Sequence, residues 1–117
     1  MGKELYHFPR KFRLSKKKEI DHLFQKGKFK SVGYLKFKYI PRDEGSSQTV
    51  ISISKRVGKA PQRNYLKRLI REALRLSLFF DTYSVSCAIY ITKPLQRKPT
   101  LSEIKHYINC FTRSLPK

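Results

Sequence analysis

The sequence predicts an α+β fold, in which one sheet packs against helices in the order α-β-β(-β)-α-β-α. Stretches in which apolar and polar residues alternate are interleaved with stretches in which apolar residues recur at helical spacing. The chain has 117 residues, of which 39% are hydrophobic, and this is the size of one ordinary domain with its own core. Because no repeat or low-complexity linker divides the chain, we expect a single domain over residues 1–117.

The first predicted element is a helix, which follows a basic opening that contains Arg10, Lys11 and Arg13. Ser15 can cap the start of this helix, and Gly27 can end it. Between these two residues, apolar side chains recur at i, i+3 and i+4, namely Ile20, Leu23 and Phe24. The spacing predicts an amphipathic helix.

Two strands are expected next. Residues 29–40 alternate, with one apolar face and one cationic face: Leu35, Phe37 and Tyr39 against Lys36 and Lys38. Residues 41–47 are typical of a turn. In residues 49–54, isoleucines alternate with serines, which indicates a second strand paired with the first.

The second half of the chain predicts a helix, a strand and a last helix. Pro61 suits the first turn of a helix, and to about Leu78 the apolar residues recur at helical spacing: Leu66, Leu69, Ile70, Ala73 and Leu76. Leu74 does not fit, because it falls among the cations. Residues 85–92 alternate again, and a capping box of Thr100 and Glu103 precedes the last amphipathic helix.

The charge balance is the most unusual property of the composition. The chain has 27 Lys and Arg against 8 Asp and Glu, which gives a formal net charge of +19. Such strong self-repulsion destabilises a folded chain unless a polyanion neutralises it. A surface that was only soluble would mix both signs, so we expect an anionic partner, which could be a nucleic acid, an anionic membrane or acidic proteins.

Other classes of partner and site have little support. No apolar run approaches the roughly 18 residues of a spanning helix, and the first 12 residues lack the apolar centre of a signal peptide. We therefore expect a cytoplasmic protein without a membrane partner. Cys87 and Cys110 have no His cluster near them, so they indicate neither a disulfide framework nor a zinc site, and both thiols are expected to pack.

The second predicted helix carries a basic ridge. At about 100° per residue, cations four apart form a stripe with Asn64 and Arg68 beside it: Arg63, Lys67, Arg71 and Arg75. A solvated helix face would interleave Glu with the cations, but here Glu72 only borders the stripe. The turn before the helix adds Lys55, Arg56 and Lys59, and free backbone N–H groups there can also receive phosphate oxygens.

Two segments within this region resemble a known signature. Segment 52–58 reads SISKRVG and segment 63–72 reads RNYLKRLIRE. They are similar to the pattern S-V-S-K-K-x-G followed by R-N-R-x-K-R-x-x-R-E of the bacterial ribonuclease P protein family. Tyr65 replaces an Arg of that pattern, and residues 59–61 depart from its usual Asn-Ala. The opening helix and the late strand with Lys93 and Pro94 also match, so the resemblance covers nearly the whole chain.

The resemblance implies an activity and its partners. Members of the family are protein subunits of a ribonucleoprotein that removes the 5′ leader from precursor tRNA, and the RNA with its bound Mg²⁺ performs the cleavage. The chain is then expected to act as a monomer in the holoenzyme, with no cofactor of its own and no DNA partner. Contact with the catalytic RNA is expected at Lys55, Arg56, Lys59, Arg63, Asn64, Lys67, Arg68, Arg71 and Arg75.

The resemblance also implies a second site and a topology. A cleft between the first helix and the sheet is expected to hold the single-stranded leader, lined by Ile20, Phe24, Lys36 and Lys38. Phe24 is the best candidate to stack on a base, although a Phe on an amphipathic helix often belongs to the core instead. The implied topology joins parallel strands through the second helix in a left-handed crossover, as in the fold class named for the second domain of a small-subunit ribosomal protein.

No catalytic constellation is apparent in the chain itself. Hydrolysis of a phosphodiester needs carboxylates that hold metal ions about 4 Å apart or a pair of acid-base groups. Glu19 and Asp21 face different ways on a helix, and the three histidines lie in different segments. Three other functions stay open: a plain RNA-binding module such as a ribosomal protein, a self-sufficient nuclease, and a binder of double-stranded DNA, for which Asn64 alone would read base edges.

Overall fold

The computed structural model describes residues 12–43 and 45–115. Arg10 and Lys11 of the basic opening lie outside the described residues. The elements are, in chain order, α2 (Lys17–Lys26), β1 (Lys28–Val32), β2 (Leu35–Pro41), β3 (Gln48–Ile53), the 3-10 helix η2 (Lys55–Val57), α3 (Ala60–Leu76), α4 (Phe79–Thr82), β4 (Val85–Ile91) and α5 (Leu101–Thr112).

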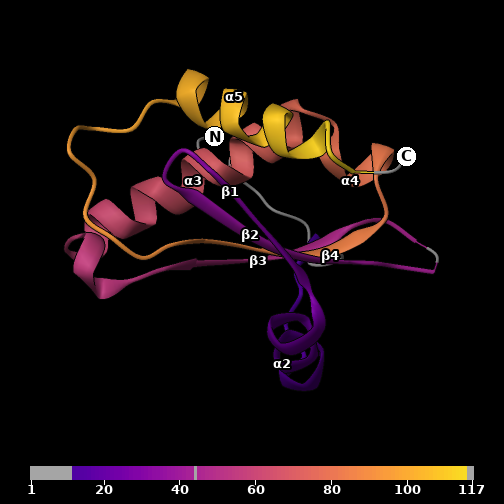
Figure 1. The fold of residues 1–117 in the computed structure, drawn as a ribbon. Helices are drawn as coiled ribbons and strands as arrows, with labels where there is room; N and C mark the ends of the chain where they lie inside the picture. Colours follow the sequence, from indigo (N-terminus) through magenta and orange to yellow (C-terminus); the bar gives the residue numbers. More distant parts are fainter. Residues whose placement is uncertain (1–11, 44, 116–117) are drawn as a thin grey trace, which may run out of the picture.

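The four strands form one sheet in the order β1-β2-β4-β3. The β1–β2 and β2–β4 pairs are antiparallel, whereas β3 and β4 are parallel and are joined through α3 and α4. Helices α3, α4 and α5 lie on one face of the sheet and α2 lies on the other (Figure 1). The predicted α+β fold is therefore confirmed, with the expected helix between parallel strands, and the handedness of that crossover stays a prediction.

The main core lies between the sheet and the helices α3 and α5. Phe37 of β2 stacks on Phe111 of α5 with ring centroids 4.0 Å apart, and Tyr39 meets the same ring edge-on at 5.2 Å. Leu35 and Phe37 are completely buried, so the predicted apolar face of β2 is confirmed. The alternation of a strand then turns Lys36 and Lys38 toward α2.

A second, smaller core lies under α2. It consists of Leu14, Leu23 and Ala88, with Ile20, Ile40, Val50 and Tyr90 packed around it. The chain before α2 is fixed by a backbone hydrogen bond of 2.7 Å from the Leu14 N–H to the Thr49 carbonyl. One buried stripe on α2 is thus enough to dock it on β2 and β4.

The single strand predicted over residues 29–40 is wrong, because two strands and a tight turn occupy it. Gly33 in the turn has a left-handed φ of 56°, and a Cβ added there would lie 2.3 Å from the Tyr107 ring. The turn reverses the chain so that Val32 pairs with Leu35. Lys28 and Lys30 consequently share the face of Phe37 and Tyr39, while Phe29 lies on the opposite face.

Two of the predicted helix starts are only partly right. Helix α2 begins after Lys16 and has no side-chain cap, so the cap expected at Ser15 is wrong, whereas the end at Gly27 is confirmed. At α5 the Thr100 hydroxyl accepts from the Glu103 N–H, as expected. The Glu103 carboxylate does not complete the capping box, because it accepts a 2.7 Å hydrogen bond from the Tyr34 hydroxyl and pairs with Arg97 at 3.2 Å.

Two leucines of α3 exchange the places that the helical pattern assigns to them. Leu74, expected among the cations, is 1% exposed, whereas Leu76, expected in the core, is 43% exposed. Leu74 belongs to the main core together with Phe79 and Phe80 of α4, a short helix that the sequence did not predict. The helix after α3 therefore shifts the buried side of α3 toward Leu74.

The two cysteines form no disulfide bond with each other. Both cysteines are free, Cys87 completely buried and Cys110 half-buried with its Sγ 3.7 Å from Nε2 of His106. Burial raises the pKa of the Cys87 thiol. Within the described ranges, no helix combines the length and the apolar character that crossing a bilayer requires.

Candidate RNA-binding surfaces

The basic ridge predicted for the second helix lies on α3, but it is not wholly on the side away from the core residues. Leu66, Ile70 and Leu74 of α3 are buried, and the first cation of the stripe lies close to them around the helix. Each following cation, four residues on, lies further around the helix toward solvent. Arg63, Lys67 and Arg71 are accordingly half-buried, and the outermost positions are Asn64, Arg68 and Arg75. The structure thus brings all six side chains to one helix, but the exposed line differs from the predicted stripe.

The turn before α3 is tied to the helix by hydrogen bonds. Nε of Arg63 donates to the Gly58 carbonyl at 3.2 Å, and the Lys59 N–H donates to Oε1 of Gln62 at 2.7 Å. The Arg56 N–H donates to the Ser54 hydroxyl at 3.2 Å. These two N–H groups are therefore used within the protein and are not free for phosphate, whereas the side chains of Lys55, Arg56 and Lys59 are exposed.

Arg71 of the ridge has a second cation near it, Arg13. Burial lowers the pKa of Arg71, and the nearby positive charge of Arg13 lowers it further. Arg13 thus adds a cation to this surface, which the sequence could indicate only as part of a basic opening. One turn further along α3, a hydrogen bond to Glu72 raises the pKa of Arg75. Glu72 compensates part of the charge there, and an RNA phosphate beside Arg13 and Arg71 would relieve their repulsion.

The predicted leader-binding residues gather on the side of the sheet that carries α2, which we call the α2 face. Phe24 packs on Tyr90 of β4 with ring centroids 5.7 Å apart and an interplanar angle of 58°. Its side chain is still 40% exposed. Phe24 therefore both packs and presents part of its ring to solvent. Ile20 lies at the margin of the smaller core.

The two lysines of the α2 face come from β2. Lys36 lies opposite Tyr90 and Lys38 opposite Ala88 in the β2–β4 register, and Nζ of Lys36 donates to the Thr92 hydroxyl at 3.0 Å. A hollow of about 370 Å³ lies beside Lys36, with Ser31, Thr92 and Lys93 among its lining residues. The α2 face therefore combines aromatic rings with cations next to a surface depression.

Sequence reasoning missed Tyr90 as a member of this face. The signal was present, since Tyr90 alternates with the buried Ile89 and Ile91 and so points to the other side of the sheet. The alternating pattern of the strand could not show that α2 would cover the side of the sheet to which Tyr90 points. Burial raises the pKa of the Tyr90 hydroxyl, in keeping with a ring partly covered by Phe24.

The chain offers little for metal chemistry where the structure is described. In residues 12–43 and 45–115, no three His, Cys, Asp or Glu side chains gather closely enough to hold a metal ion. The ridge offers cations that suit a polyanion, and the α2 face offers aromatic rings together with cations.

Comparisons with known sequences agree with the motif. Residues 8–115 match the family model described as Ribonuclease P. A protein named ribonuclease P protein component from Dictyoglomus turgidum is 40% identical over 72 residues, which are 62% of this chain and 60% of that protein. A protein of the same name from Chlamydia abortus is 29% identical over 111 residues, which are 93% of this chain and 75% of that protein. The first of these matches spans less than two thirds of the relative's length.

Solved structures share the fold. The RNase P protein from Thermotoga maritima superimposes with a TM-score of 0.75 at 18% identity, covering 90% of this chain and 98% of that one. The Staphylococcus aureus RNase P protein gives a TM-score of 0.73 at 19% identity, covering 87% of this chain and 93% of that one. Because the family model extends over nearly the whole sequence, the chain belongs to the ribonuclease P protein family.

Proposed function

We propose that this chain is the protein subunit of a ribonuclease P holoenzyme and assists the RNA-catalysed removal of the 5′ leader from precursor tRNA. The observation that carries the proposal is that two basic surfaces of different chemistry lie on α3 and on the α2 face. Helices α3 and α2 lie on opposite sides of one sheet (Figure 1). A subunit that holds a catalytic RNA and a substrate strand at the same time needs two such surfaces. Membership of the family supports this assignment.

The ridge on α3 is the proposed contact with the catalytic RNA. Its exposed cations are Arg68 and Arg75, with Lys67 and Arg71 beside them. Arg63 fixes the basic turn against the helix. Guanidinium groups bind phosphate oxygens in a bidentate manner, and a helix presents them at fixed spacing. Contacts of this kind position a folded RNA without reading its sequence.

The α2 face is the proposed contact with the leader. Single-stranded RNA exposes the faces of its bases, and these stack on aromatic side chains while cations follow the backbone. Phe24 and Tyr90 supply the rings, and Lys36 and Lys38 supply the charges. In this proposal the leader passes over these residues as the precursor tRNA binds.

The cleavage step is assigned to the RNA partner. Mg²⁺ bound by that RNA would activate the attacking water and stabilise the leaving oxygen. The protein contributes binding energy to the substrate and charge that lowers the repulsion between two RNAs. Its proposed partners are one catalytic RNA and one precursor tRNA, with the protein present as a monomer.

The ridge is tested by replacing Arg68 with Gln and measuring the affinity for a bacterial ribonuclease P RNA across a series of salt concentrations. One lost phosphate contact should weaken binding and reduce the slope of log affinity against log salt by roughly 0.7 to 0.9. Lys18→Gln is the matched control, because Lys18 is exposed on α2 and lies about 140° around that helix from the buried Leu23. If both variants lower the slope equally, RNA is bound by overall charge and the ridge assignment is wrong.

A further inference from the structure

The edge strand β1 carries an aromatic side chain that neither core uses. Phe29 is 54% exposed, more than Phe24 or Tyr65. A large apolar side chain on an edge strand favours pairing with other chains and is usually avoided there unless a partner covers it. The exposure of Phe29 therefore indicates that a binding partner covers this side chain. The neighbouring residues indicate the chemistry of that partner.

The register places Phe29 at the margin of the α2 face. Phe29 lies opposite Lys38, and Ser31 lies opposite Lys36, so these side chains share one side of the sheet. Two strand spacings, roughly 10 Å, separate β1 from β4 with Tyr90. The α2 face thus continues outward from Phe24 and Tyr90, across two lysines, to a second exposed ring at the edge.

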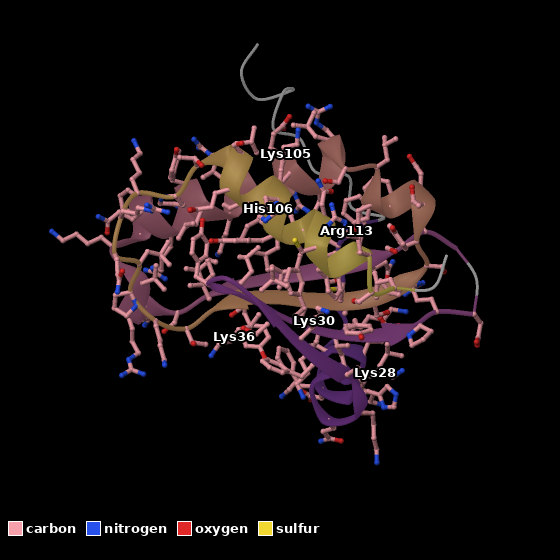
Figure 2. The ribbon with its side chains drawn as sticks, turned by 45° about the horizontal axis from the view of Figure 1, so that its top comes forward. Lys28, Lys30, Lys36, Lys105, His106 and Arg113 are labelled. Atoms are coloured by element: carbon pink, nitrogen blue, oxygen red, sulfur yellow. The ribbon has the colours of Figure 1, made fainter. Side chains whose placement is uncertain are left out.

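The other side of β1 is cationic. Lys28 and Lys30 lie opposite Tyr39 and Phe37, whose rings pack on Phe111 of α5. They therefore point to the side of the sheet that carries α5. Figure 2 shows both lysines on β1 at the side of the molecule that faces the viewer, with His106 of α5 and Arg113, the residue after this helix, above them in that view.

Acidic residues are absent from the segments that form this edge. The sequence has no Asp or Glu between Asp21 and Asp43, and none after Glu103. Glu103 itself is engaged by Tyr34 and Arg97 at the start of α5. On its α5 side the edge strand thus carries Lys28 and Lys30 without acidic neighbours in these segments. On the α2 face it carries Phe29, which lies opposite Lys38.

We propose that single-stranded RNA leaves the α2 face over the edge strand β1, with a base stacked on Phe29 and with phosphates near Lys28 and Lys30. This inference rests on the proposed function, because the strand would be the part of the leader that lies beyond Phe24. Rings that alternate with cations are the chemistry of a single-strand path, whereas a duplex would offer no base face to Phe29.

Lysines on an edge strand have another use, since they prevent pairing between sheets of different molecules. That role explains Lys28 and Lys30 without any RNA. It does not explain why Phe29, between them in the sequence, is exposed on the other side of the strand. The two explanations predict different results for the same variants.

The test measures the affinity of the reconstituted holoenzyme for two precursor tRNAs, one with a leader of about 4 nucleotides and one with about 16, which bracket the length that a small single-strand fold covers. Phe29→Ala should weaken binding of the long leader by roughly fivefold to a hundredfold, and leave the short one unchanged. Phe29→Tyr should restore binding, because it keeps the ring. The double variant Lys28→Gln with Lys30→Gln should reduce the salt slope by roughly 1.4 for the long leader only.

Lys18→Gln should leave the affinity for both precursor tRNAs unchanged, and it serves as the control for loss of charge. Equal effects on both leader lengths would overturn the proposal, as would lysine variants that self-associate but bind the long leader normally. These outcomes differ from a failure of the proposed function itself, in which the unmodified chain would not promote binding or cleavage of either substrate by the RNA.

Discussion

Phe24 illustrates how one residue can serve both packing and a surface. A helical pattern gives no means of choosing between the core and a stacking platform. In the structure the ring packs on Tyr90 and remains 40% exposed, while Leu23 beside it is completely enclosed. Leu23 therefore docks the helix, and Phe24 can contact a ligand without leaving its place.

Replacing Phe24 with Ala tests that division. We expect the holoenzyme to bind a leader-bearing precursor tRNA more weakly by about 1 to 3 kcal/mol, the contribution of one stacked base, with a much smaller change for mature tRNA. Binding is measured by titration of the two RNAs under the same salt. Equal losses on both RNAs would show that Phe24 acts through the packing of α2.

Tyr34 provides a test of stability against pH. Its hydroxyl donates to the Glu103 carboxylate, and burial together with this hydrogen bond raises the pKa of Tyr34. The neutral phenol is therefore favoured in the folded protein. Its contribution is complete below the unfolded pKa of about 10 and is lost as the pH rises above that value.

Tyr34→Phe should lower the free energy of unfolding by about 1 kcal/mol near pH 8, the usual contribution of one hydrogen bond. Above about pH 10 the difference from the unmodified protein should shrink. Urea unfolding of the variant and of the unmodified protein, near pH 8 and above about pH 10, measures this difference in the free energy of unfolding. A difference that is constant with pH would mean that the hydroxyl is not held by Glu103 in the folded state.

At the scale of elements, the β1–β2 turn determines which side chains reach which face. Read as one strand, residues 29–40 would place Phe29 with Leu35 and Phe37 in the core. The turn at Gly33 instead moves Phe29 to the α2 face and the neighbouring lysines to the α5 side. Alternation alone could not reveal this, because the pattern looks regular on both sides of the glycine.

Gly33→Ala should destabilise the protein more than Gly45→Ala. Both glycines have a left-handed φ, of 56° and 86°, so an added methyl group costs each about 1 kcal/mol in the backbone. Only Gly33 has the Tyr107 ring against it, whereas nothing lies within 4 Å of a Cβ at Gly45. Thermal unfolding should therefore show the larger fall in Tm for Gly33→Ala, and equal falls would contradict the close packing of the turn on α5.

The sequence predicted the long elements better than the short ones. Helices α3 and α5 and the strand β4 follow from strong periodicity and from Pro61 and Thr100 near their starts. Helix α4 has only four residues, too few for any periodicity to appear. Because α4 covers part of α3, missing it also reversed the expected places of Leu74 and Leu76.

At the scale of the whole molecule, the composition predicts the class of partner, and the tertiary structure determines on which surface each candidate contact residue lies. The net charge of +19 indicated a polyanion, and the motif in residues 52–72 indicated the family. The order of the strands, the side of the sheet that α2 covers and the positions of Tyr90 and Phe29 depend on long-range packing. Those are the features that separate the ridge from the α2 face, to which the proposed function assigns different forms of RNA.

The most direct test of the whole account is cleavage of a precursor tRNA at near-physiological Mg²⁺ by this protein alone, by a bacterial ribonuclease P RNA alone, and by both together. We expect cleavage at the mature 5′ end when both are present, at a rate well above that of the RNA alone, and none by the protein alone. No enhancement by the protein would reduce it to a general RNA binder, and cleavage by the protein alone would contradict the assignment of catalysis to the RNA.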